Sequence, residues 1–265
     1  MLYSKINSIV WRSTLNVLHG VAVGLLVMVP LGFLMLKASY IHTEFLRYHV
    51  GTRTFMLLRN VPVGDQSGGG TGFLVKAPSG KTFMITNDHV CVGTTGGIMH
   101  ASNDYTTYDA QIIERSQKTD LCVLTAPSDY SDGLSFASEI YRGEQVRAVG
   151  YPKLMPLTMS NVGDIIYTGE TTFSDKVSAP AQFSPAKCDI ANPKYSIFRD
   201  GNNIETCNIY IPEAMWMNIL VRHGSSGSPI VNFYGNVAGI VAAKDESDWG
   251  VGLPFYEIKD FLSNR

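Results

Sequence analysis

The sequence predicts an all-β fold, built from antiparallel strands, for the part of the chain beyond residue 50. Short apolar or β-branched runs alternate there with turn residues, and no long segment of helical period precedes the end of the chain. The 265 residues also include 25 Gly and 12 Pro without a repeating period, which is typical of a turn-rich β protein. We therefore expect an antiparallel barrel or sandwich.

The strand runs begin at residue 52 and continue in order along the chain. They cover residues 52–63, 71–78, 82–90, 108–115, 120–127, 144–152, 228–234 and 237–244. Gly, Asn, Asp and Pro separate them, as turns between strands require. The last two runs form the clearest hairpin, because Gly235 and Asn236 between them can supply the positive φ values of a tight turn.

The end of the chain predicts a helix. Apolar side chains recur there at helical spacing, and they are Phe255, Ile258, Phe261 and Leu262. Pro254 suits the first turn of such a helix. Residues 51–265 as a whole are enough for two closely packed barrels that share one cleft.

The first 50 residues predict a membrane anchor. No Asp, Glu, Lys or Arg occurs over residues 13–36, and a helix of this length spans a bilayer core of about 30 Å. A cleaved signal peptide would have a shorter apolar region. We expect an N-terminal tail at residues 1–14, a transmembrane helix at residues 15–36 and a linker at residues 37–50. The basic tail favours a cytoplasmic N-terminus, so this single-pass protein would hold residues 51–265 on the non-cytoplasmic side.

Composition and cysteine spacing exclude several kinds of partner. The net charge is −2 and Lys and Arg do not cluster, so nucleic-acid binding is not expected. No C-x-x-C pattern occurs and the histidines are scattered, so neither a metal nor another cofactor is expected. Cys188 and Cys207 bracket a polar, turn-rich segment that a disulfide can close, the alternative being two free thiols. Cys91 and Cys122 lie in apolar runs and are interpreted as core thiols.

Three short stretches carry residues suited to acyl transfer. Residues 224–229 read G-S-S-G-S-P, and glycines on both sides of Ser226 allow a tight turn that exposes a hydroxyl beside backbone N–H groups. His89 follows an apolar run, and Asp120 begins another, where its carboxylate would seek a donor such as an imidazole N–H. Each stretch alone has a structural interpretation: a serine-rich turn, a loop histidine, or an acid at a strand start.

The three residues together specify one chain order. An α/β-hydrolase would run Ser, acid, His, and its G-x-S-x-G elbow requires Gly where this chain has Ser228. His before Asp before Ser is the order of chymotrypsin. The sequence resembles the trypsin/chymotrypsin-like serine proteases of the HtrA (Deg) type, over roughly residues 55–262. The matching stretches are GGGTGFLV, ITNDHV, KTDLCVL, VRAVGYP, GSSGSPIVN and VAGIVAAK.

The resemblance implies a fold and a set of roles. The fold would be two six-stranded antiparallel β-barrels followed by a C-terminal helix. His89 would be the general base, Asp120 the acid that orients it and Ser226 the nucleophile, with the N–H groups of Gly224 and Ser226 as the oxyanion hole. The reaction would be hydrolysis of peptide bonds in protein or peptide substrates through an acyl-enzyme, and a homo-oligomer is left open.

The same resemblance places a specificity pocket beside the nucleophile. Leu220 would lie near its base, and residues Val241, Ala242, Ala243 and Lys244 would line it. With no carboxylate at position 220, we expect small or medium apolar side chains to be preferred, although Lys244 and His223 could instead favour an acidic one.

The sequence departs from the HtrA pattern in three ways. Asp120 and Ser226 are 106 positions apart, no PDZ domain follows, and Ser228 stands where Gly is common. Ser228 is also compatible with virus-type polyprotein-processing proteases of this fold. The remaining alternative is a catalytically silent binding module on the same scaffold.

Overall fold

The computed structural model describes residues 28–60, 68–116, 119–176, 195–199, 205–244 and 248–265, except positions 30, 33 and 264. The chain divides into two compact units, residues 1–46 and residues 47–265. Residues 34–51 are helical, so the expected linker at 37–50 is a helix over its whole length. Several large apolar side chains of the first unit are exposed: Met28, Val29, Leu31, Leu34, Met35 and Leu36.

The expected transmembrane helix falls largely outside the described residues. Residues 15–27 of that segment are not described. In the part of the chain that the structure does describe, no helix is both long and apolar enough to cross a bilayer.

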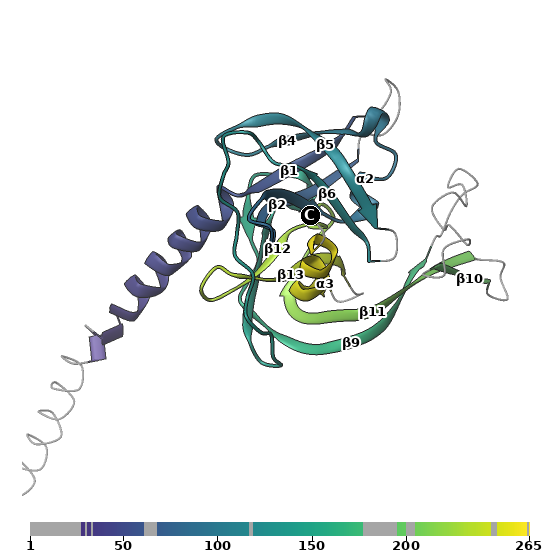
Figure 1. The fold of residues 1–265 in the computed structure, drawn as a ribbon. Helices are drawn as coiled ribbons and strands as arrows, with labels where there is room; N and C mark the ends of the chain where they lie inside the picture. Colours follow the sequence, from purple (N-terminus) through teal and green to yellow (C-terminus); the bar gives the residue numbers. More distant parts are fainter. Residues whose placement is uncertain are drawn as a thin grey trace, which may run out of the picture. The chain divides into compact units, whose positions relative to one another are not determined.

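The second unit contains a closed six-stranded barrel. Its strands are β1 (Thr54–Arg59), β2 (Gly69–Lys76), β3 (Thr82–Thr86), β4 (Ile98–Ser102), β5 (Thr107–Ser116) and β6 (Leu121–Thr125). They pair antiparallel in the order β1-β2-β3-β6-β5-β4, and β4 returns to β1 (Figure 1). Fully buried apolar side chains, among them Phe55, Leu57, Leu74, Met84 and Leu124, fill its interior.

A second barrel follows along the chain. Its strands are β7 (Gln145–Gly150), β9 (Gly163–Lys176), β11 (Glu205–Leu220), β12 (Pro229–Asn232), β13 (Val237–Lys244) and β14 (Trp249–Pro254). β9 pairs with both β11 and β7, which closes the ring β9-β11-β14-β13-β12-β7. β8 (Thr158–Met159) adds to β7. β10 (Tyr195–Arg199) adds to the far end of β11 (Figure 1). The two six-stranded antiparallel barrels predicted from the sequence are confirmed.

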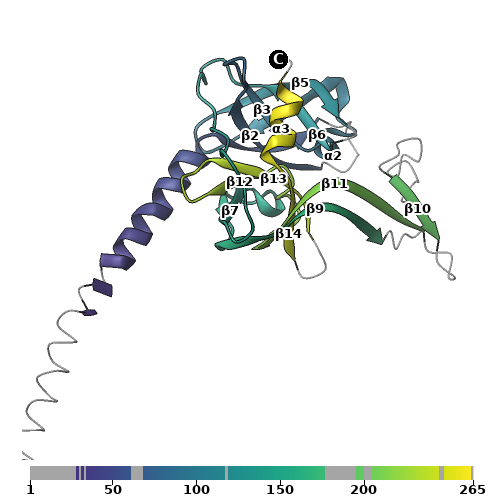
Figure 2. The same ribbon diagram turned by 60° about the horizontal axis from the view of Figure 1, so that its bottom comes forward.

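The predicted hairpin and helix are present at the end of the chain. β12 and β13 form the hairpin, but only Gly235 has a positive φ, of 81°, so the expectation for Asn236 was wrong. The side chain of Asn232 instead holds the turn by accepting the N–H groups of Tyr234 and Asn236, both at 3.1 Å. Helix α3 (Phe255–Leu262) follows β14 directly and lies beside β13 (Figure 2).

Three short helical segments complete the described fold. They are α2 (Asp88–Cys91), η1 (Thr95–Gly97) and η2 (Pro152–Leu154). α2 follows β3 of the first barrel, and η2 follows β7 of the second. α2 carries His89, and Lys153 of η2 donates its N–H to the His223 carbonyl, shortly before Ser226.

Candidate active site

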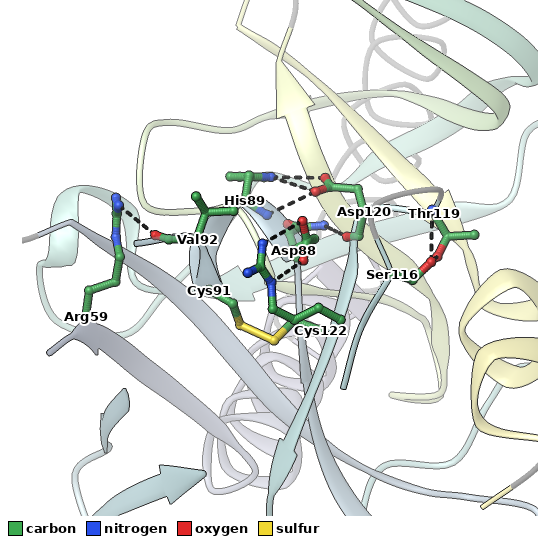
Figure 3. A network of polar contacts seen from close by, with 11 residues as sticks. Arg59, Asp88, His89, Cys91, Val92, Ser116, Thr119, Asp120 and Cys122 are labelled. Atoms are coloured by element: carbon green, nitrogen blue, oxygen red, sulfur yellow. Dashed lines mark hydrogen bonds and ion pairs between the residues drawn. A yellow bond between two sulfur atoms is a disulfide. The ribbon is translucent and has the colours of Figure 1, made fainter. Parts of the chain in front are cut away.

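His89 and Asp120 are in direct contact at one end of the first barrel. His89 lies on α2, directly after β3, and Asp120 directly precedes β6. The imidazole Nδ1 is 3.1 Å and 3.0 Å from the two carboxylate oxygens of Asp120, and the backbone N–H of His89 donates to the same carboxylate at 3.1 Å (Figure 3). A carboxylate on Nδ1 fixes the tautomer in which Nε2 carries the lone pair, which is the form that acts as a base.

The backbone of Asp120 helps to hold this contact. Its φ of 54° is in the left-handed region, which Asp tolerates better than most residues. Its carbonyl accepts the N–H of Asp88 at 3.0 Å and the side-chain amide of Asn87 at 3.2 Å. Asp120 is 8% exposed, whereas the side chain of His89 is 43% exposed, so the acid is buried and the imidazole is accessible.

A second, buried carboxylate lies beside His89. Asp88 is 4% exposed and forms a two-point ion pair with Arg115 on β5, with Nε to Oδ1 at 2.6 Å and Nη2 to Oδ2 at 3.2 Å. This pair neutralises the Asp88 charge and ties α2 to β5. Asp88 was visible next to His89 in the sequence, but nothing local indicated Arg115 as its partner.

A disulfide joins the same two elements as the His89–Asp120 contact. Cys91 on α2 and Cys122 on β6 are bonded, with their Cα atoms 6.6 Å apart (Figure 3). Each cysteine is two residues after one member of the contact. The interpretation of Cys91 and Cys122 as core thiols was therefore wrong: both are buried, but they are paired. Cys188 lies outside the described residues, so its pairing with Cys207 stays a prediction.

Ser226 lies on the turn between β11 and β12, against β2 of the first barrel. Its carbonyl accepts the backbone N–H of Thr71 at 2.8 Å. A Cβ atom on Gly70 would lie 2.8 Å both from this carbonyl and from the side chain of Val90, which follows His89. The serine turn and the histidine segment therefore flank the same point of β2. The Ser226 hydroxyl forms no hydrogen bond within the described residues.

The turn presents two backbone N–H groups without partners. Gly224 and Gly227 have φ values of +87° and +84°, which favour glycine. The carbonyls of His223 and Ser225 accept the N–H groups of Lys153 and Ser228, respectively. Since N–H and C=O point in opposite directions across a trans peptide, the N–H groups of Gly224 and Ser226 point away from the donors Lys153 and Ser228. Within the described residues neither N–H has an acceptor, as an oxyanion hole requires.

The expected pocket residues lie next to this turn. Val241 on β13 is bonded to it twice, because its carbonyl accepts the Gly227 N–H and its N–H donates to the Ser228 carbonyl, both at 2.9 Å. Ala242 is buried and Ala243 half-buried. Lys244 forms an ion pair with Asp248, and this contact lowers the pKa of the Asp248 carboxyl.

The side chain of Leu220 does not lie in the interior. It is 56% exposed at the end of β11, whereas Ile219 and Val221 on either side are buried. A Cβ atom on Gly250 would lie 2.9 Å from Ile219 and 3.3 Å from Val221, so these two side chains pack against the start of β14. Both side chains belong to the apolar core of the second barrel, together with Met215, Met217 and Val241.

Comparison with known proteins agrees with this arrangement. The family of the trypsin-like peptidase domain matches residues 70–240, well over half of the chain. Serine protease Do-like HtrA of Bacillus subtilis is 27% identical over 193 residues, covering 72% of this chain and 36% of that protein. The probable periplasmic serine endoprotease DegP-like of Chlamydia pneumoniae is 27% identical over 235 residues, covering 86% and 38%. The chain thus spans little more than a third of the length of these relatives.

Solved structures share the fold. The protease Rv3671c of M. tuberculosis, in its active form, superposes with a TM-score of 0.61 at 18% identity, covering 82% of each chain. The HtrA-type protease AlgW with a tripeptide superposes with a TM-score of 0.58 at 17% identity, covering 82% of this chain and 62% of that one. At these identities the likeness establishes the fold.

Proposed function

The chain belongs to the trypsin-like peptidase domain family and is HtrA-like within it, and on that premise we propose that it is a serine endopeptidase that hydrolyses peptide bonds through an acyl-enzyme on Ser226. The observation that carries the proposal is the contact of the His89 imidazole with the buried Asp120 carboxylate, at 3.0 and 3.1 Å. A binding module would have no need of a histidine held in the basic tautomer.

The proposed mechanism assigns a step to each of these groups. His89 Nε2 takes the proton of the Ser226 hydroxyl as its oxygen attacks the substrate carbonyl, and Asp120 stabilises the imidazolium that forms. The N–H groups of Gly224 and Ser226 bind the oxyanion, and each such donor is worth about 3 kcal/mol in related chemistry. His89 then donates its proton to the leaving amine, and water hydrolyses the ester on Ser226 by the reverse sequence of proton transfers.

Labelling with a fluorophosphonate tests the proposal on the full chain. Wild-type protein is expected to be labelled, and Ser226→Ala and His89→Ala proteins are not. Ser225→Ala is the matched control, because the neighbouring Ser225 is buried and its hydroxyl accepts the Arg222 N–H. Labelling that survives in Ser226→Ala, or that is lost only in Ser225→Ala, would overturn the assignment.

We propose that the substrate side chain before the scissile bond is small or medium and apolar. The expected base of the pocket carries the apolar side chain of Leu220, and neither it nor Val241 or Ala242 can pair with a cation. Asp248 compensates the charge of Lys244, which disfavours the alternative preference for an acidic side chain. A peptide library should be cleaved after Ala, Val or Leu; cleavage mainly after Arg or Lys, or after Asp or Glu, would contradict this.

We further propose that residues 15–36 anchor the protease in a membrane, with residues 51–265 on the non-cytoplasmic side. The uncharged run over residues 13–36 supports this, as do the exposed apolar side chains between Met28 and Leu36. A soluble wild-type chain after alkaline carbonate extraction of membranes would contradict the anchor. Digestion of residues 51–265 by protease added to the cytoplasmic side would contradict the orientation.

A further inference from the structure

Thr71 forms four hydrogen bonds although its side chain is fully buried on β2. Its N–H donates to the Ser226 carbonyl at 2.8 Å, and its hydroxyl donates to the Gly224 carbonyl at 2.9 Å. The hydroxyl also accepts the Tyr151 N–H at 3.0 Å, and the Thr71 carbonyl accepts the Thr86 hydroxyl at 2.7 Å. One residue of the first barrel therefore contacts the serine turn and the segment after β7 of the second barrel.

Both carbonyls that Thr71 binds belong to the residues whose N–H groups would form the oxyanion hole. The peptide before Gly224 is held by Lys153, whose N–H donates to the His223 carbonyl, and the peptide after Gly224 is held by the Thr71 hydroxyl. With the peptides on both sides of its Cα held, the direction of the Gly224 N–H is set.

Ser226 is held in the same way. The peptide before it is held by Ser228, whose N–H donates to the Ser225 carbonyl, and the peptide after it is held by the Thr71 N–H. Thr71 thus supplies one of the two constraints at each residue. Only the constraint at Gly224 depends on the Thr71 side chain, so a substitution can remove it without breaking the backbone contact at Ser226.

The packing leaves the serine turn little freedom to move toward β2. A Cβ atom on Gly227 would lie 1.9 Å from the Thr71 carbonyl, and one on Gly150 would lie 2.9 Å from the Thr71 hydroxyl. The hydroxyl is therefore enclosed between the turn and the end of β7. An apolar group in its place would leave the Gly224 carbonyl and the Tyr151 N–H buried without partners.

We infer that Thr71 is a positioning residue for the oxyanion hole: its buried hydroxyl holds the Gly224 carbonyl and so directs the Gly224 N–H toward the oxyanion. This inference rests on the proposed function. It adds a residue from the first barrel to a site whose nucleophile and oxyanion donors come from the second.

The test measures fluorophosphonate labelling of the full chain over a range of probe concentrations, which separates the maximal labelling rate from the half-saturating concentration. Thr71→Val, of nearly the same shape, is expected to lower the maximal rate about 100-fold, the effect of losing one oxyanion donor, without changing the half-saturating concentration. Thr71→Ser retains the hydroxyl and is expected to stay within about threefold of wild type.

Thr54→Val is the matched control. Thr54 is also fully buried, on β1 of the same barrel, and its hydroxyl donates to the Val50 carbonyl at 2.9 Å, away from the serine turn. Its loss removes a buried hydroxyl of the barrel without affecting the Gly224 carbonyl. The maximal labelling rate of Thr54→Val is expected to stay within about threefold of wild type.

The outcomes distinguish this inference from the proposed function. Labelling of Thr71→Val at the wild-type rate, or an equal loss in Thr54→Val, would overturn the inference alone. Absence of Ser226-dependent labelling in wild-type protein would overturn the proposed function and this inference with it. Should Thr71→Val not fold, Thr71→Cys gives the same comparison, because a thiol is a weak hydrogen-bond donor; a wild-type rate there would equally overturn the inference.

Discussion

Asp120 combines a buried carboxylate with a left-handed backbone, at a φ of 54°, and the two properties can be separated by substitution. Asn adopts this backbone conformation readily, whereas Ala does so at a cost of about 1 kcal/mol. Asp120→Asn is therefore expected to keep the unfolding free energy of wild type but to lower the labelling rate about 10³- to 10⁴-fold, because the imidazole loses its orienting charge. Asp120→Ala should lose both activity and stability.

Urea unfolding and labelling rates check this pair of variants. Equal stability of Asp120→Asn and Asp120→Ala would show that the backbone conformation carries no cost. A labelling rate of Asp120→Asn within tenfold of wild type would show that the carboxylate does not act on His89.

The ion pair between Asp88 and Arg115 leads to a second prediction, which concerns the stability of the fold. Arg115→Met removes the partner of a carboxylate whose side chain is 6% exposed and is expected to destabilise the fold by about 2 kcal/mol. The double variant with Asp88→Asn removes the uncompensated charge and should recover at least half of this loss. A double-mutant cycle from urea unfolding measures the coupling, and additive losses would show that the two side chains do not stabilise each other.

A disulfide joins the elements α2 and β6 covalently. The Cys91–Cys122 disulfide closes a loop across 31 positions, for which loop entropy gives about 3–4 kcal/mol of stabilisation. The Cys91→Ala, Cys122→Ala protein is expected to unfold at a correspondingly lower urea concentration. Reductant should destabilise wild type to a similar extent and leave the double variant unchanged, and a wild-type protein insensitive to reductant would contradict the bond.

The elements also show which parts of the structure local patterns can predict. The hairpin β12–β13 and the helix α3 depend on residues adjacent in sequence, and both were predicted. The Cys91–Cys122 bond and the Arg115 contact depend on how α2 packs on β5 and β6, which no local pattern encodes. Leu220 illustrates a third case: neighbouring side chains of a strand point to opposite faces, so Ile219 and Val221 are buried where Leu220 is exposed.

For the whole molecule, the order His89, Asp120, Ser226 and the glycines around the serine predict a candidate site that spans the two barrels. The contact between His89 and Asp120 is local to the first barrel, at α2 and β6. Thr71 lies in the stretch GGGTGFLV, but nothing local indicates a role for its hydroxyl. Both hydrogen bonds of that hydroxyl go to residues more than 75 positions away, and only the fold brings them together.

Stability of the whole domain is expected to vary with pH through Glu144, just before β7. Its Oε1 accepts the Asn232 side-chain amide at 3.3 Å, whereas Oε2 is buried without a partner among the described residues. Burial raises the pKa of Glu144 above its ordinary value of 4.5. The folded state therefore binds this proton more tightly than the unfolded state, and its stability falls as pH rises from about 4.5 through the folded pKa.

Thermal unfolding of Glu144→Gln checks this sign. The variant cannot ionise, so at about pH 7.5 it should unfold roughly 2 °C higher than wild type, a small gain because solvent screens part of the charge. The gain should shrink toward pH 4.5, where the wild-type carboxyl is protonated in the folded state. A gain that grows on acidification would contradict the raised pKa.

The proposed mechanism requires that Ser226 becomes acylated during turnover. Full-length protein is mixed with the p-nitrophenyl ester of N-protected alanine, quenched in acid within the first turnover and digested for mass spectrometry. We expect an acyl group on the peptide that carries Ser226, equal in amount to the initial burst of p-nitrophenol and absent from His89→Ala and Ser226→Ala. Steady release of p-nitrophenol with no adduct on Ser226, or at an undiminished rate in Ser226→Ala, would contradict it.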